Sequence, residues 1–469
     1  IRDPTIDGRR EVRTGGPQEG SQPLRSGHGE SRSDPPALAR CTGRLAMEPS
    51  LEHARSLDRS DPLAGFRDRF LIADPDMCYL DGNSLGRLPK DTAEAVQQMT
   101  VEGWGGELVT GWSHWIDMAQ TVGDRLGNTV LGAQSGQVLA TDTTSVNLYR
   151  LAIAAIKDRP GRSTIVVDEA NFPTDRYILQ GIATDLGMEL RTIPNEDPHI
   201  AECERITPAI LEQYVDDDVA LVCLQVINYR SGARQDVPAL TETARQHGAY
   251  LLWDASHAVG ALDLQFDAWG VDLAIGCTYK YCNSGPGSPA WLYIRSEHQG
   301  RLDTPIDGWF GQRDQFTMGP QFDRAPGMRG FQIASPSIVG LTAVDVSMSI
   351  LAEAGMAEIE AKAGAGTDFM IELFDAFLAP LGFGLETPRA ASQRGGHLSL
   401  THPQADRISV AMRDMANVIP DYRKPNTIRV AVAPLYTSYE EMFIGFERTR
   451  DLVASGRHDD ISPIQGGVT

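Results

Sequence analysis

The sequence predicts an α/β protein with a large, doubly wound, mostly parallel sheet domain and a smaller α+β domain. Between about residues 111 and 332, apolar runs of strand length alternate with stretches of helix length, which is typical of a parallel sheet covered by helices. After about residue 333, a long helical stretch leads into fewer and shorter strand candidates. A chain of 469 residues is long enough for two or three domains.

The N-terminal part changes character along its length. Residues 1–55 are rich in Gly, Pro, Ser and Arg and lack apolar periodicity, so we expect a disordered extension, with Met47 as the native start. Helices are expected from Ser60, near Asp91, and over about residues 116–131, where apolar residues recur at helical spacing.

The central region supplies the predicted sheet. Because parallel strands bring their carboxyl ends to one edge, where open α/β sheets bind ligands, polar residues directly after these strands are the first candidates for a site. The predicted strands cover residues 137–140, 164–167, 219–226, 249–253 and 271–276, and the predicted helices cover 146–156 and 237–247.

The C-terminal region, residues 333–456, is predicted to form the smaller domain, and residues 457–469 to form a tail. Helices are expected over residues 338–363, 366–379 and 438–454, and strands over 397–401 and 428–432.

The composition excludes several classes of partner. A net charge of -21 disfavours nucleic acid and anionic membrane surfaces, both of which attract clustered Lys and Arg. No apolar run reaches the roughly 18 residues of a membrane span. The six cysteines are scattered without a C-x-x-C pair, so we expect reduced thiols and a cytoplasmic location. No Cys/His cluster has the spacing of a zinc site, and we expect no metal.

Two charged residues end neighbouring predicted strands. Asp254 closes the run 249–253, and Lys280 follows the run 271–276. A lysine that forms a Schiff base and an acid that keeps a pyridine nitrogen protonated are the requirements of pyridoxal phosphate. By themselves, the two residues fit an exposed ion pair at least as well, because charged side chains are usually exposed. The flanking sequence is therefore needed to distinguish a cofactor site from an exposed ion pair.

Other polar and aromatic residues follow predicted strands in the same way. Thr144 and Ser145 would open a helix, where they either bind a phosphate or act as a plain N-cap. Phe172 could stack on a flat ring, with Asp175 beside it, or belong to a buried turn. His257 could support Asp254 or be a core histidine. Arg429 could bind a carboxylate, or it could be an ordinary arginine on an exposed strand.

Read together, ten segments resemble kynureninases, a family of pyridoxal-phosphate enzymes of the aspartate-aminotransferase fold type (fold type I), and the bacterial members most of all. The resemblance runs from about residue 58 to 455. The segments, in chain order, are YLDGNSLG, WGGELVTGW, TDTTSVNLY, NFPTD, NYRSG, WDASHAVGA, AIGCTYKYCNSGPG, GWFGQ, ASPSI and RVAVAPLYTS.

The resemblance implies a role for individual residues. Lys280 corresponds to the Schiff-base lysine, and Tyr279 is the candidate proton donor beside it. Arg429 would bind the substrate carboxylate, together with Asn83 and Ser84 of the segment 56–110, which is expected to contribute to the small domain and the active site. The positions implied in cofactor binding are Thr144, Ser145, Phe172, Asp175, Asp254, His257, Tyr279, Lys280, Trp309 and Ser335.

The implied activity is hydrolysis of L-kynurenine to anthranilate and L-alanine in tryptophan degradation, a route that can feed NAD biosynthesis, by a homodimer with active sites at its interface. Gly106 and Ser335 stand where eukaryotic members carry His and Asn, which favours unsubstituted kynurenine over 3-hydroxykynurenine; His114 could compensate. At Gln225 the family commonly has a small hydroxyl or aliphatic residue. Another fold type I enzyme, such as a class V aminotransferase, and a non-catalytic dimeric binding protein are the alternatives.

Overall fold

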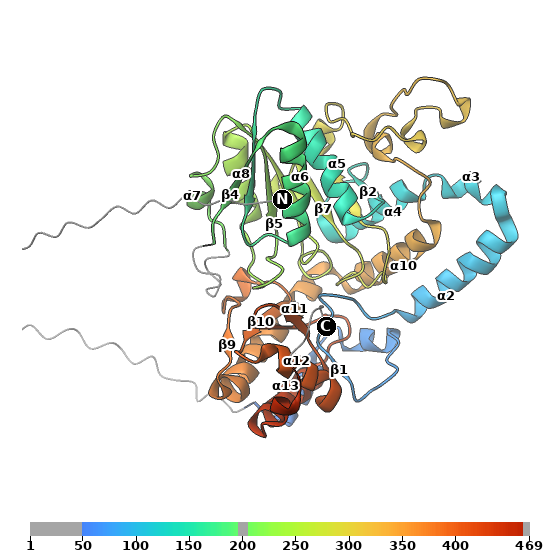
Figure 1. Ribbon diagram of the computed structural model, residues 1–469. Coiled ribbons are helices and arrows are strands. Elements are labelled where there is room, and N and C mark those ends of the chain that lie inside the picture. The colour runs from blue at the N-terminus through green and yellow to red at the C-terminus, as the bar shows by residue number, and fades with distance from the viewer. Residues whose placement is uncertain (1–48, 196–204, 463–469) are drawn as a thin grey trace, which may run out of the picture. The chain divides into compact units, whose positions relative to one another are not determined.

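The computed structural model describes residues 49–195 and 205–462 (Figure 1). Its helices are α1 (Leu51–Ser60), α2 (Lys90–Gln98), α3 (Trp112–Trp115), α4 (Met118–Leu126), α5 (Thr144–Lys157), α6 (Pro173–Leu186), α7 (Pro208–Leu211), α8 (Val237–Gln246), α9 (Phe266–Trp269), α10 (Ile338–Ala354), α11 (Met356–Leu373), α12 (Ala405–Ala416) and α13 (Tyr439–Ala454). Its strands are β1 (Cys78–Tyr79), β2 (Val138–Ala140), β3 (Thr164–Asp168), β4 (Glu189–Ile193), β5 (Val219–Gln225), β6 (Tyr250–Asp254), β7 (Leu273–Gly276), β8 (Trp291–Ile294), β9 (Gly384–Leu385), β10 (His397–Thr401), β11 (Val418–Ile419), β12 (Asp421–Arg423) and β13 (Thr427–Ala431).

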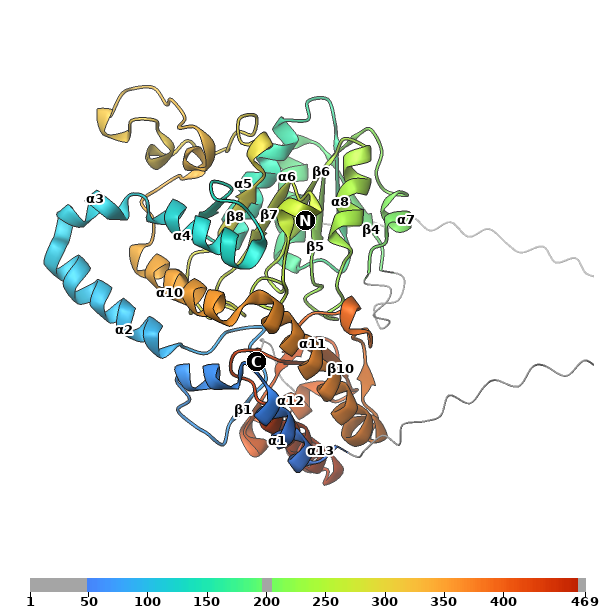
Figure 2. The ribbon, with the colours of Figure 1, turned by 180° about the vertical axis from the view of Figure 1, so that it is seen from behind.

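A seven-stranded sheet in the order β2-β8-β7-β6-β5-β3-β4 forms the centre of the larger part. The pairs from β7 through β6, β5 and β3 to β4 are parallel, while β8 pairs antiparallel with both β7 and β2. Helices α5 and α6 cover one face and α8 covers the other (Figures 1 and 2). The predicted doubly wound, mostly parallel α/β architecture is thereby confirmed.

Buried hydrophobic side chains form two clusters. The larger surrounds the seven-stranded sheet and includes α10, which packs against α2 and α4. The smaller lies between α11, α12, α13 and a four-stranded antiparallel sheet in the order β12-β13-β10-β9. It also takes in Ala54, Cys78 and Leu80, so the first described segment of the chain packs with the last.

Several expected boundaries are wrong. The helix expected from Ser60 ends there instead: α1 begins at Leu51, inside the stretch expected to be disordered, because the Ser50 side chain accepts from the N–H of His53 at 3.2 Å and caps it. The rest of that extension, residues 1–48, lies outside the described residues. The expected tail begins with a helical turn, Arg457–Asp460.

The expectation of one long helix over residues 338–363 is also wrong, because the helix ends at Ala354. Gly355, at φ +80°, ends α10, a conformation that suits glycine. Gly366 instead lies inside α11, where an added Cβ would come within 2.9 Å of Val432. Strands β4 and β8 were not expected; Glu189, Arg191 and Thr192 give the sequence of β4 the look of a loop.

Within the described ranges, no single helix has the length and apolar content of a membrane span. One bent pair, Ile338–Ala354 with Met356–Leu381, meets these two criteria jointly, with a bend of 79° between its halves.

Candidate active site

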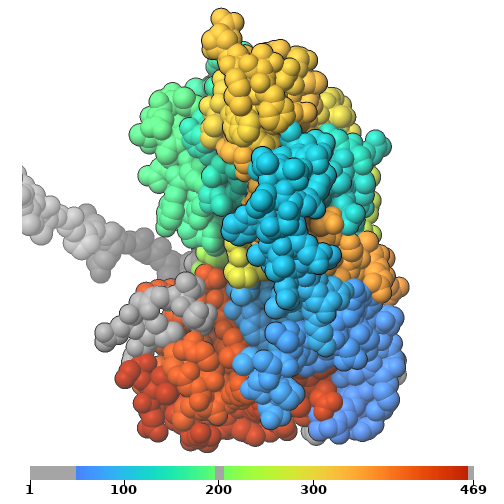
Figure 3. Space-filling view, turned by 90° about the vertical axis from the view of Figure 1, so that its right-hand side faces the viewer, coloured from blue at the N-terminus to red at the C-terminus, as the bar shows by residue number. Residues whose placement is uncertain are grey.

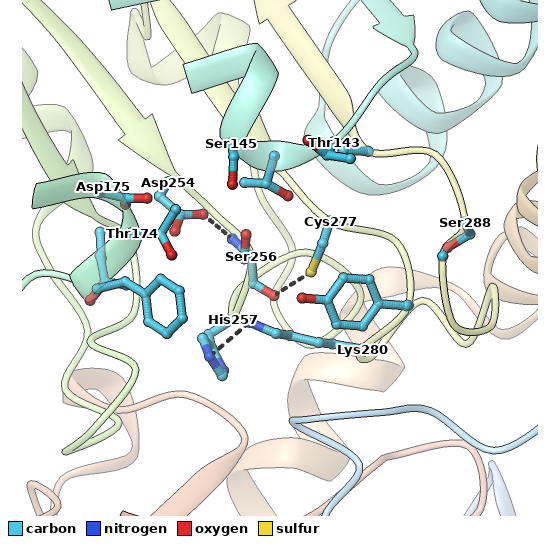
Figure 4. A pocket seen from close by; sticks show the side chains of 16 residues that line it. Thr143, Ser145, Thr174, Asp175, Asp254, Ser256, His257, Cys277, Lys280 and Ser288 are labelled. Carbon is cyan, nitrogen blue, oxygen red and sulfur yellow. Dashed lines mark hydrogen bonds between the residues drawn. The ribbon is translucent and has the colours of Figure 1, made fainter. Parts of the chain in front are cut away.

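A cavity of about 280 Å³ lies at the carboxyl ends of the central strands (Figure 4). This position is the usual ligand site of an open α/β sheet, and the volume is near the lower end of the roughly 300–1,000 Å³ of small-molecule sites. The lining residues come from the segments that follow β2, β3, β5, β6 and β7 and from the loop before β8: Thr143, Thr144, Ser145, Phe172, Thr174, Asp175, Gln225, Asp254, Ser256, His257, Cys277, Tyr279, Lys280, Gly287, Ser288 and Ala290.

Eight residues predicted from the sequence meet in this cavity. Strand ends that are far apart in the chain become neighbours because β5, β6 and β7 pair side by side, with Gln225 opposite Asp254 and Asp254 opposite Ile275. The eight are Thr144, Ser145, Phe172, Asp175, Asp254, His257, Tyr279 and Lys280.

One part of the cavity is suited to an anion. Thr143 is the N-cap of α5, and its hydroxyl accepts from the N–H of Val146 at 3.3 Å. Thr144 and Ser145 form the first turn of this helix of 14 residues, and the Ser288 hydroxyl lines the same cavity. Free N–H groups, hydroxyls and the positive end of the helix dipole together favour a phosphate.

Two buried acids lie side by side in another part of the cavity (Figure 4). Asp254 ends β6, and its Oδ1 accepts from the backbone N–H of Ser256 at 2.8 Å. Burial, the adjacent charge of Asp254 and a hydrogen bond with that carboxyl raise the pKa of Asp175 well above its ordinary value. Asp175 therefore favours its protonated form, whose hydroxyl can donate to the neighbouring carboxyl group.

Lys280 is held by a histidine. Its Nζ lies 2.9 Å from Nε2 of His257, a contact drawn in Figure 4. Burial lowers the pKa of His257 well below its ordinary value, and the charges of Lys280 and Arg429 act in the same direction. His257 is therefore neutral and accepts from the Lys280 amine.

Tyr279 precedes the lysine and lines the cavity with it. The neighbouring Cys277 and burial raise the pKa of Tyr279, so its phenol keeps its proton. The Nζ of Lys280 lies 5.9 Å from the centre of the Tyr279 ring. A protonated hydroxyl that lines the same cavity can act as a proton donor.

A glycine of the N-terminal segment is fixed against the lysine loop. The N–H of Gly86 donates to the carbonyl of Tyr279 at 2.8 Å. A Cβ at Gly86 would lie 2.4 Å from the carbonyl oxygen of Lys280 and 2.7 Å from the Cα of Asn283. The backbone that carries Lys280 thus rests directly on residue 86, with no room for a side chain.

Arg429, Asn83 and Ser84 lie outside this cavity. Arg429 is buried, and its Nε donates to Asp421 at 2.5 Å, its Nη1 to the carbonyl of Tyr229 at 2.5 Å and its Nη2 to Ser84 Oγ at 3.1 Å. Asn83 is fully buried, and neither of its amide atoms has a hydrogen-bond partner in the described part of the chain.

Trp309 and Ser335 are exposed and do not line the cavity of this chain. Trp309 is 45% exposed, with its ring 4.6 Å from that of Phe310. Ser335 lies in the segment before α10.

Four further lining residues could hardly be recognised from the sequence. Ser256 and Ser288 look like ordinary loop residues, and Cys277 like the end of an apolar strand. Gln225 stands out only as a departure from the related family. Its Oε1 accepts from the N–H of Tyr229 at 3.3 Å. The signal shared by Gln225, Ser256 and Cys277 was their position at or just past the end of a strand.

One group of side chains elsewhere in the described residues has the geometry of a metal site: Asp272, Glu297 and His298. His298 Nε2 already bonds Asp272 at 2.8 Å, and Arg245 lies 3.6 Å from the same carboxylate. His298 and Arg245 thus already provide the Asp272 carboxylate with polar partners, so it does not need a metal ion.

The residues around the cavity fit pyridoxal phosphate. An amine, a buried acid and a helix N-terminus with hydroxyls correspond to its aldehyde, its pyridine nitrogen and its phosphate. Phe172 supplies an aromatic ring at the wall, fixed by Tyr229 at a ring distance of 5.1 Å.

Comparison with known proteins supports both the fold and the family. The kynureninase C-terminal domain family matches residues 359–447. The kynureninase of Burkholderia pseudomallei (strain 1106a) is 37% identical over 410 residues, which cover 86% of this chain and 95% of the relative. That of Pseudomonas fluorescens is 36% identical over 396 residues, covering 83% and 92%.

Solved structures with a similar fold include a cystine C–S lyase in complex with cysteine persulfide, with a TM-score of 0.69 and 18% identity over 83% of this chain and 99% of the other. The cysteine desulfurase of Thermococcus onnurineus has a TM-score of 0.69 and 19% identity, over 85% and 98%. At this identity the likeness concerns the fold, which is the expected fold type I. Together with the sequence relatives, it confirms the expected resemblance: the chain belongs to the kynureninase family.

Proposed function

We propose that this protein is a pyridoxal-phosphate-dependent hydrolase that cleaves the Cβ–Cγ bond of L-kynurenine to give anthranilate and L-alanine. The observation that carries the proposal is the meeting of Lys280 and Asp254 at one cavity in a chain of the kynureninase family. Pyridoxal phosphate, when bound, supplies the electron sink for a carbanion at the substrate Cα.

The residues of the chain have separate tasks in this proposal. Lys280 holds the cofactor and, once free as an amine, removes the Cα proton, with its Nζ oriented by His257 at 2.9 Å. Asp254, assisted by Asp175, provides the anion for a protonated pyridine nitrogen. Tyr279 delivers a proton to the carbonyl or to Cβ while water adds to the γ-carbonyl and the Cβ–Cγ bond breaks.

Arg429 would bind the substrate α-carboxylate. Its guanidinium is buried against Asp421, which keeps the planar group in one orientation. The Ser84 hydroxyl, at 3.1 Å from Nη2, is the weakest of its contacts and the one that a carboxylate would replace or share. Asn83, buried next to Ser84 and without a hydrogen-bond partner among residues 49–195 and 205–462, is a further donor for the same group.

The preferred substrate would be kynurenine without a ring hydroxyl. Gly106 carries no side chain, and Ser335 carries only a short hydroxyl, so neither offers the longer polar groups that could hold a 3-hydroxyl. His114 is the remaining candidate, and it pairs with Glu107 at 3.4 Å.

The active form would be a homodimer with shared sites. Two segments, residues 101–109 and 306–322, expose large apolar side chains, and both lie on the face seen in Figure 3. They are joined where Trp112 contacts Phe310 at a ring distance of 5.9 Å. An exposed apolar surface of this kind typically mediates association. The exposed residues are Val101, Trp104, Leu108, Val109, Ile306, Trp309, Phe316, Met318 and Phe322.

Anthranilate and alanine formation would place the enzyme in tryptophan degradation by the kynurenine route. We further propose a reducing compartment, the cytoplasm, because Cys78, Cys223, Cys277 and Cys282 are buried free thiols.

The direct test adds kynurenine or 3-hydroxykynurenine to the purified protein with pyridoxal phosphate and follows anthranilate or its hydroxy analogue together with alanine. Borohydride treatment followed by peptide mapping should place a covalent label at Lys280. An aminotransferase would instead convert its cofactor to the amine form and require a keto acid. A non-catalytic binding protein would release no product, and a label at another lysine would also contradict the proposal.

A further inference from the structure

A second histidine lies next to the Lys280–His257 pair. His397 opens β10 of the smaller sheet, is fully buried, and has no hydrogen-bond partner on Nδ1 or Nε2 among the described residues. The Nδ1 of His257 is likewise buried without a partner. A buried polar nitrogen without a partner is unfavourable, so three such atoms on two adjacent rings need an explanation.

The two rings are close enough to serve each other. Their centres are 5.4 Å apart and their planes are tilted by 52°. Two imidazoles joined by one N–H···N hydrogen bond of ordinary length have centres roughly 5 Å apart. The two rings therefore lie at a distance at which one N–H···N hydrogen bond can join them.

The contact with Lys280 determines which nitrogen of His257 carries the proton. Nε2 faces the Lys280 amine at 2.9 Å, and an ammonium group can only donate. A neutral His257 that accepts on Nε2 has its proton on Nδ1, where it needs an acceptor. His397 is the neighbouring ring that has a free lone pair to offer.

Charges around the two rings keep both neutral. Lys280, Arg429 and Arg423 act on His257, and Arg429 and Lys280 act on His397, all disfavouring an imidazolium. Burial lowers the pKa of His397 well below its ordinary value, against a small opposite effect of the Tyr229 and Arg230 carbonyls, neither of which meets hydrogen-bond geometry.

Two further groups complete this environment. Asp421 neutralises part of the Arg429 charge by accepting from it. The hydroxyl of Tyr281, buried and also without a partner in the described chain, faces the neighbouring Gly396 and stays protonated because burial raises its pKa. In this setting one neutral imidazole can donate a hydrogen bond to the other while neither ring becomes charged.

We propose that His397 is a positioning residue for Lys280: it accepts the Nδ1 proton of His257 and thereby keeps Nε2 of His257 available to the lysine amine. The inference rests on the proposed function, since it assigns Lys280 to proton removal. A histidine of the smaller domain would then control the basicity of a lysine in the larger one.

The test compares His397→Leu, which removes the acceptor, with His397→Gln, whose amide oxygen can still accept. His402→Leu is the control, because His402 lies just beyond the same strand and contacts Phe383 rather than the site. Without an acceptor, His257 should move its proton to Nε2 and donate to the amine lone pair. Turnover should fall roughly tenfold or more, because general-base catalysis by Lys280 then loses its free lone pair.

The pH profile has a defined sign. In the substrate complex, where Lys280 is free of the cofactor, its ammonium form loses a hydrogen bond in His397→Leu, so the free amine forms at lower pH and the acid limb of kcat should move down by about one unit. His397→Gln and His402→Leu should keep the wild-type limb. A folded His397→Leu protein with an unchanged limb, or an equal shift in His397→Gln, would overturn the proposal.

The position of the proton on His257 can also be measured without following the reaction. In the histidine-labelled full chain, long-range ¹H–¹⁵N NMR should show the His257 proton on Nδ1, and on Nε2 in His397→Leu, with His257→Gln used to assign the signals. If wild-type protein releases no anthranilate, the proposed function fails while this measurement still decides the role of His397. A wild-type His257 proton on Nε2 would refute that role.

Discussion

Replacing Asp81 by asparagine should change how stability depends on pH. Asp81 lies in the loop after β1, beside Asp421 and Arg429. Its Oδ1 is buried and has no hydrogen-bond partner within the described residues. Burial, followed by the charge of Asp421, raises its pKa from 3.8 to about 7, against smaller opposite effects of Ser84 and Arg429.

The sign follows from proton counting. Between about pH 4 and pH 7 the folded chain holds a proton on Asp81 that the unfolded chain has lost, so the free energy of unfolding decreases as pH rises through this window. At about 1.4 kcal/mol per pKa unit, the full shift corresponds to up to about 4 kcal/mol. Asparagine does not titrate, so Asp81→Asn should remove this loss.

Urea unfolding at pH 5 and at pH 8, for the wild type and Asp81→Asn, measures the effect. The variant should be more stable than the wild type by up to about 4 kcal/mol at pH 8 and by less than half of that, about 1.5 kcal/mol, at pH 5, where only part of the window has been crossed. Asp76→Asn, an exposed acid of the segment before β1, serves as the control and should behave like the wild type. If Asp81→Asn and the wild type lose stability equally between the two pH values, Asp81 does not titrate as its burial requires.

Three more predictions concern an ion pair, the lysine and the dimer. Asp421→Ala should lower the free energy of unfolding by about 3–5 kcal/mol because it leaves Arg429 buried and unpaired, whereas Asp323→Ala, in an exposed pair, should cost at most about 1 kcal/mol in urea unfolding. Lys280→Ala should abolish anthranilate release while its circular dichroism spectrum stays unchanged; measurable turnover would contradict its role. Trp309→Ala should raise the dimer dissociation constant in sedimentation; an unchanged constant would place Trp309 outside the interface.

The sequence was sufficient to predict those site residues whose place in the fold follows from the geometry of a parallel sheet. Asp254 and Lys280 could be placed at the same edge because alternating strands and helices predict parallel strands, and parallel strands share their carboxyl ends. The parallel core of the sheet was predictable for the same reason. Strands β4 and β8 were not, because one carries polar side chains at the sheet edge and the other returns antiparallel after an irregular loop.

Contacts between distant parts of the chain could not be predicted. Arg429 suggested a carboxylate, but nothing in the sequence indicated that the antiparallel register of β12 and β13 sets Asp421 directly opposite it. His397 looks like a core residue of a small strand, and its importance depends on the ring of His257, which another part of the chain supplies. Boundaries such as the start of α1 depended on a single capping serine.

The contact at Gly86 has a consequence for movement. Because its amide donates to the Tyr279 carbonyl and no Cβ would fit between it and the lysine loop, a shift of the segment after β1 would break this hydrogen bond or move the loop with it. That segment also carries Ser84, the neighbour of Arg429. In the proposed function, where Arg429 binds the substrate carboxylate and Lys280 removes the proton, a movement of this segment that exposed Arg429 would also disturb the backbone of Lys280, so substrate entry and proton transfer would be coupled through residue 86.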